Sequence, residues 1–95
     1  MPNMDKKKYD DSNFRKLLAE EITWPHVYMF KFIVPANQEK EAQVLQFFPK
    51  GAEISYKKSR TGKYISITIR TLTQSPNEVL QYYENVAKIE GVMSL

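Results

Sequence analysis

The chain has 95 residues, of which 42% are hydrophobic and 26% charged, a composition typical of a globular protein. It contains no cysteine, which excludes disulfides, thiol nucleophiles and cysteine-bound metals. No apolar stretch approaches the ~20 residues of a membrane span, and the first residues lack the hydrophobic region of a signal peptide. We therefore expect a cytoplasmic protein that does not associate with membranes.

The N-terminal segment divides into a polar tail and a short helix. Residues 1–11 are charged and without periodicity, so we expect a disordered tail, and residues 12–95 are expected to form a single domain. Ser12 can cap a helical appendage over residues 12–22. Its apolar stripe is predicted to contain Phe14, Leu17, Leu18 and Ile22. Pro25 marks the end of this segment, because the residue before a proline avoids helical angles.

Three stretches read as strands before the last helix. Residues 26–34 (HVYMFKFIV) are aromatic and β-branched, and residues 64–71 alternate with a period of two. That alternation places Ile65, Ile67 and Ile69 on one face and Tyr64, Ser66, Thr68 and Arg70 on the other. Between them, the sequence predicts a strand over residues 52–59 with Ile54 and Tyr56 directed inward.

Two further helices and a final strand complete the pattern. Asn37 can cap a helix whose apolar positions are Ala42, Leu45 and Phe48. Ser75, Pro76 and Glu78 form a strong helix start. The second helix is predicted to end at Gly91 and to bury Val79, Leu80, Tyr83, Val86 and Ala87, leaving Tyr82 on the surface. The sequence predicts a short last strand over residues 92–95.

The resulting order is strand, helix, strand, strand, helix, strand. Right-handed crossovers place both helices on one face of a four-stranded antiparallel sheet. We therefore predict an α+β protein with a ferredoxin-like βαββαβ sandwich. The other face of the sheet is either open or covered by the N-terminal helix.

Basic residues are concentrated in one acid-free part of the chain. No aspartate or glutamate lies between Ile54 and Asn77. Such a stretch is either a solvated basic hairpin or a surface that attracts an acidic partner. The candidate binding residues are Lys31, Lys57, Lys58, Arg60, Lys63, Tyr64 and Arg70.

The segment RTGK at residues 60–63 resembles a turn more than a ligand loop. Gly62 can supply a positive φ between two strands. A phosphate-binding loop requires more glycines and a following helix, whereas a strand follows here. RNA binding is also disfavoured, because Tyr64 is the one aromatic residue expected on the open face.

The sequence offers little for catalysis. His26 is the only histidine, so a histidine pair or cluster is excluded. The acidic pairs at residues 10–11 and 20–21 lie in the tail and at a helix end, and do not converge from separate elements. We expect no enzyme activity, no catalytic residues, no metal site and no cofactor.

Several motifs resemble the YbeD-like proteins, a bacterial family of unknown function. The resemblance covers residues 14–95 and rests most on SRTGKYISIT at residues 59–68. Other matching motifs are Trp24-Pro25, Phe30-Lys31-Phe32, Tyr83-Glu84 and the ending GVMSL. The resemblance implies a ferredoxin-like fold similar to ACT-type regulatory domains, and hence a regulatory or protein-binding role. It supplies no catalytic residues.

The sequence thus favours a small binding or regulatory module that recognises another protein, acidic in character, through the basic hairpin and the open sheet face. The alternative is an ACT-type amino-acid sensor that acts as a homodimer. Against that alternative, ACT domains usually carry a glycine between the first strand and first helix, and residues 34–37 (VPAN) have none. RNA binding is the third and weakest hypothesis.

Overall fold

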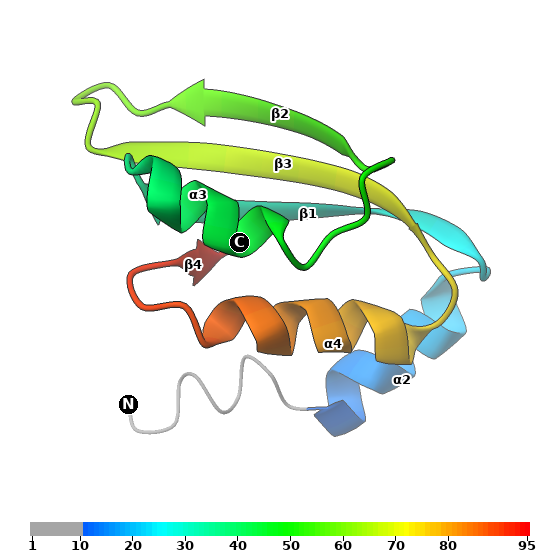
Figure 1. Ribbon diagram of the computed structural model, residues 1–95. Helices are drawn as coiled ribbons and strands as arrows, with labels where there is room; N and C mark the ends of the chain where they lie inside the picture. The colour runs from blue at the N-terminus through cyan, green and yellow to red at the C-terminus, as the bar shows by residue number, and fades with distance from the viewer. Residues whose placement is uncertain (1–10) are drawn as a thin grey trace.

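The computed structural model describes residues 11–95, and Figure 1 shows their arrangement. Its elements are, in chain order, α2 (Asp11–Glu21), β1 (His26–Pro35), α3 (Gln38–Leu45), β2 (Glu53–Lys58), β3 (Tyr64–Thr73), α4 (Pro76–Ala87) and β4 (Met93–Ser94). The predicted disordered tail lies outside the described residues, apart from Asp11, which begins α2. The protein is α+β, with the predicted order of strands and helices.

The four strands form one sheet in the order β2-β3-β1-β4, and every neighbouring pair is antiparallel. The longest pairing joins β1 to β3, from His26↔Thr73 to Pro35↔Tyr64. By contrast, β4 pairs with β1 only at Phe32 and Ile33. Figure 1 shows α3 and α4 on the same face of this sheet.

The core lies between the sheet and these two helices. On β1 and β3, alternate side chains are fully buried, including Phe30, Phe32, Ile67 and Ile69 at 0% exposure. Helix α4 contributes Val79, Tyr83 and Val86, and α3 contributes Val44. The predicted face of the 64–71 segment is therefore confirmed, and the intervening residues of β3 point away from the helices.

Aromatic rings fill the centre of the core. Phe30 lies 5.2–5.3 Å, between ring centroids, from Phe48, Tyr82 and Tyr83. Tyr82 stacks on Phe48 at 4.4 Å with an interplanar angle of 9°. The prediction of Tyr82 as a surface ring is wrong, because the loop after α3 carries Phe48 back onto the flank of α4.

Helix α2 packs on the helical layer and leaves the opposite face of the sheet uncovered. The Phe14 ring lies 5.9 Å from that of Tyr83, and Leu18 is only 4% exposed. The Trp24 indole Nε1 donates a hydrogen bond to the Leu18 carbonyl at 3.1 Å, fixing the end of the helix. Leu17, predicted to share the apolar stripe, is instead 56% exposed.

Two of the three predicted helix starts are confirmed by their caps, whereas α2 begins at Asp11, before the predicted cap Ser12. Asn37 Oδ1 accepts hydrogen bonds from the backbone N–H groups of Glu39 and Lys40. The Ser75 side chain accepts from the Glu78 N–H, while Glu78 Oε1 accepts from the Gln74 N–H at 2.7 Å. The glutamate thus reaches one residue beyond the cap, a variation on the capping box.

Three other predictions about element ends and faces are wrong. Helix α4 ends at Ala87, and Gly91, with φ 86°, lies in the turn that follows. Ala42 and Ala87 are exposed. The predicted inward direction of Tyr56 is confirmed by its pairing with Ile67, but the side chain is 53% exposed, because β2 is an edge strand.

Two apolar residues on opposite faces of β3 provide a test of this architecture. Ile67→Ala should lower the free energy of unfolding by about 2–5 kcal/mol, since it opens a cavity beneath the helices. Leu72→Ala, at a position 52% exposed on the opposite face, should cost less than about 1 kcal/mol. Urea denaturation measures both values, and equal losses would contradict the assigned faces.

The environment of Tyr82 predicts a pH dependence of stability. Burial, followed by the charge of Glu78 and a hydrogen bond to it, raises the pKa of Tyr82 above 10.0. The native chain therefore retains a proton that the unfolded chain loses, and stability decreases as pH rises above about 10. Tyr82→Phe should show a smaller decrease between about pH 9 and 11 in urea denaturation. Identical pH slopes for the two proteins would exclude this contribution.

Candidate functional site

The hairpin between β2 and β3 is a tight turn held together by Ser59. The Ser59 N–H donates to the Tyr64 carbonyl at 2.8 Å, and the Tyr64 N–H donates to Ser59 Oγ at 3.1 Å. Inside this closure, the Gly62 N–H donates to the Ser59 carbonyl at 3.0 Å. Gly62 has φ 78°, and a Cβ at this position would meet no atom within 4 Å, so backbone conformation alone favours glycine here.

The sheet face opposite α3 and α4 is called the open face. Strands β1 and β3 supply most of its side chains: Val27, Met29, Lys31, Ile33, Tyr64, Ser66, Thr68, Arg70 and Leu72. The edge strands add Glu53, Ser55, Lys57 and Met93. Five large apolar side chains here are roughly half exposed, namely Val27, Met29, Tyr64, Leu72 and Met93.

An open pocket of about 400 Å³ lies where the open face meets the hairpin. Four of the seven predicted binding residues line it: Lys57, Lys58, Arg60 and Tyr64. Ile33, Ser59 and Ser66 complete the lining. The structure thus brings more than half of the predicted set together at one place, with cationic, aromatic, hydroxyl and aliphatic groups around one hollow.

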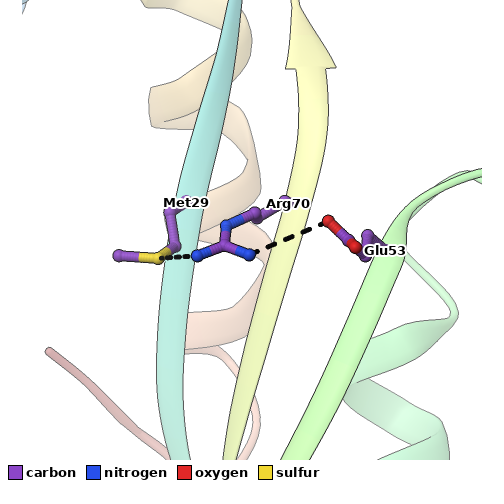
Figure 2. A network of polar contacts seen from close by, with 3 residues as sticks. All are labelled: Met29, Glu53 and Arg70. Carbon is purple, nitrogen blue, oxygen red and sulfur yellow. Dashed lines mark hydrogen bonds and ion pairs between the residues drawn. The ribbon is translucent and has the colours of Figure 1, made fainter.

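Arg70 does not line this pocket. Figure 2 shows that it already has partners on β1 and β2. Its guanidinium lies 3.8 Å from Glu53 Oε1 and donates a hydrogen bond to Met29 Sδ at 3.6 Å. Six residues of strand separate it from Tyr64, which corresponds to about 20 Å. The Arg70–Glu53 ion pair is exposed and therefore adds little stability, but it places a carboxylate beside Arg70.

The two remaining predicted residues also lie outside the pocket. Lys31 is exposed in the middle of the open face, opposite Thr68. Lys63 is exposed in the hairpin, and its carbonyl accepts a hydrogen bond from the Ala36 N–H at 2.9 Å. The seven residues are therefore spread over the open face and the hairpin, and only Lys57, Lys58, Arg60 and Tyr64 share a cavity.

The pocket residues absent from the predicted binding set are Ile33, Ser59 and Ser66. Ser66 and Ile33 lie directly opposite each other on β3 and β1, a relation that depends on strand register. Their alternation is visible in the sequence, but their proximity is not. The sequence signal for this hollow is Ser66, a small residue in a strand of mostly larger side chains.

His26 has a structural position. Its ring lies edge-on to Trp24 at 5.9 Å and to Tyr28 at 6.2 Å. Its carbonyl accepts a hydrogen bond of 2.7 Å from Thr73 Oγ1. This hydrogen bond joins the start of β1 to the end of β3, about 20 Å or more from the hairpin pocket.

Two other kinds of feature are absent from the part of the chain that the structure describes. Within residues 11–95, no group of three or more histidine, cysteine, aspartate or glutamate residues could hold a metal ion. None of the helices in that range has the length and apolar character needed to cross a bilayer.

Comparison with known proteins identifies a family. Neither the curated proteins nor the solved structures contain a match to this chain. The family model DUF493, described as a protein of unknown function, matches residues 19–95. The match includes the open face, the hairpin and the closing strand, and it begins inside α2 rather than at residue 14. The chain therefore belongs to the DUF493 or YbeD-like family of proteins of unknown function, as the motifs of the hairpin and the C-terminal end indicated.

Proposed function

We propose that this chain is a non-enzymatic module that binds another protein, acidic in character, through its open face and basic hairpin. One observation carries the proposal. Lys57, Lys58 and Arg60 surround a pocket, and within residues 11–95 none of them has an ion-pair partner. Cations without an intramolecular carboxylate remain available to an acidic partner and would steer its approach.

The apolar side chains of the open face support a protein as the partner. Met93 is 57% exposed and Tyr64 47% exposed, and both lie near the pocket, while Val27 and Leu72 form an exposed cross-strand pair at the far end. Exposed apolar side chains gathered on one face are typical of interaction surfaces. Since α2 packs against α4, this face has no cover from the described residues.

The architecture supports the regulatory character that the family resemblance implies. We infer a ferredoxin-like sandwich, because two β-α-β units place both helices on one face and the outer strands β2 and β4 beside β3 and β1. A cytoplasmic regulatory module with this fold would act by presenting its open face. This inference from fold to role is an analogy, and the binding surface is argued from the residues themselves.

The amino-acid sensor and the RNA-binding hypothesis are less well supported. The pocket lies at the β2–β3 hairpin, and the β1–α3 turn, where ACT-type domains place their glycine, contributes no lining residue. RNA recognition by a sheet face relies on several stacked rings. Among the described open-face residues, Tyr64 supplies one ring.

Charge reversal at the hairpin tests the proposal. Arg60→Glu combined with Lys63→Glu should abolish most capture of protein partners from a lysate of the native host, because it converts attraction of an acidic surface into repulsion. Lys16→Glu combined with Lys50→Glu, an equal charge change at exposed positions on α2 and after α3, should leave capture unchanged. Quantitative mass spectrometry of the captured proteins provides the measurement.

Three outcomes would contradict the proposal. Unchanged capture by the hairpin variant would exclude the basic hairpin as the binding surface. Specific thermal stabilisation of the wild-type chain by a free amino acid would favour the sensor hypothesis. Salt-sensitive retention on single-stranded RNA that Tyr64→Ala abolishes would favour nucleic-acid binding.

A further inference from the structure

The hollow in the open face exists because Ser66 is small. Strand register aligns Lys57, Ser66, Ile33 and Met93 in one row across β2, β3, β1 and β4, called here the Ser66 row. Within this row, the short serine lies between the longer side chains of Lys57 and Ile33. The Tyr64 ring borders the hollow on the hairpin side, since Tyr64 and Ser66 point to the same face of β3.

The side chains of the Ser66 row change from cationic at β2 to apolar at β4. At its β2 end, Lys57 lies next to the hairpin cation Arg60, and both line the pocket. At its β4 end, Ile33 and the 57% exposed Met93 present aliphatic and thioether surface. A ligand that follows the row must therefore carry an anionic group at one end and an apolar group at the other.

We propose that the pocket is the recognition site for an extended peptide segment of the partner, with an acidic side chain two residues from an aliphatic one. This inference rests on the proposed function and names the feature recognised. The carboxylate pairs with Lys57 and Arg60, and the aliphatic side chain lies over Ile33 and Met93. Two inter-strand spacings, about 9.5 Å, separate Lys57 from Ile33. Residues two apart in an extended peptide lie about 7 Å apart with their side chains on the same face, and the lengths of the two side chains cover the remaining distance.

The apolar half of the row distinguishes this ligand from a free anion. Inorganic phosphate or a small carboxylate would contact only the cationic end and would leave Ile33 and Met93 exposed. Arg70, farther along the face, has Glu53 beside it, so the carboxylate is directed to the hairpin end. The register of the sheet therefore determines both the position of the acidic residue and the side on which the aliphatic residue follows.

Fluorescence anisotropy with the full chain tests the proposal. The probe is a labelled peptide with aspartate and leucine separated by one glycine in a glycine-serine background, so that both side chains point to the same face of the extended peptide. Wild-type protein should bind it saturably, and replacing the aspartate with asparagine or the leucine with serine should weaken binding by about tenfold or more. Absence of saturable binding at concentrations up to about 1 mM would overturn the proposal.

A pair of matched protein variants tests the position of the site. Ser66→Leu fills the hollow without changing charge and should weaken binding of the same peptide by about tenfold or more. Ser55→Leu makes the same change on the open face of β2, outside the pocket, and should alter the affinity by less than about twofold. Equal binding by the two variants would overturn the assignment.

A third variant keeps the test informative if Ser66→Leu fails to fold. Lys57→Gln changes an exposed position of the edge strand β2 and should weaken binding of the aspartate peptide but not of its asparagine version.

Failure of this inference can be distinguished from failure of the proposed function. Partner capture that requires Arg60 and Lys63 but is insensitive to Ser66→Leu would remove the peptide site and leave protein binding through the hairpin intact.

Discussion

The alternation of side chains along β3 is the constraint on which the rest of this structure depends. Because successive residues of a strand point to opposite faces, burial of Ile67 and Ile69 beneath α3 and α4 directs Ser66, Thr68 and Arg70 to the open face. A shift of the register by one residue would exchange the two sets. The stability of the core and the composition of the binding surface are therefore determined by the same pairing of β1 with β3.

The hairpin connects this core to the candidate site. Ser59 closes the turn through its backbone and its hydroxyl group, and Tyr64 is the partner in both contacts. These bonds hold the end of β2, with its two lysines, beside the start of β3. The ring that borders the pocket and the cations around it are consequently held together by one short, locally closed segment.

Strong local signals make much of the fold predictable from sequence. The period-two pattern of residues 64–71, the aromatic run of β1 and the caps at Asn37 and Ser75 each depend on a few neighbouring residues. Helical faces are harder to predict. Periodicity assigns Tyr82 to the surface because it takes no account of Phe48, which follows α3 and supplies the stacking partner.

The candidate site is only partly predictable, for a related reason. The acid-free stretch identifies the cations at the hairpin, and four of the seven predicted residues line the pocket. The predicted set includes Arg70 because Glu53 lies outside that stretch in sequence, although it lies opposite Arg70 across the β2–β3 pairing. Ile33 and Ser66 escape prediction because a hollow depends on which residues are neighbours across strands.

The shortness of β4 has a consequence for the backbone of β1. The Lys31 carbonyl accepts a hydrogen bond from the Leu95 N–H, so odd-numbered residues of β1 direct their backbone groups toward β4. The amides of Val27 and Met29 point the same way, beyond the two residues with which β4 pairs. Deuterium should accordingly replace their protons sooner than those of Tyr28 and Phe30, whose amides face β3, giving β1 an alternating pattern of solvent exchange.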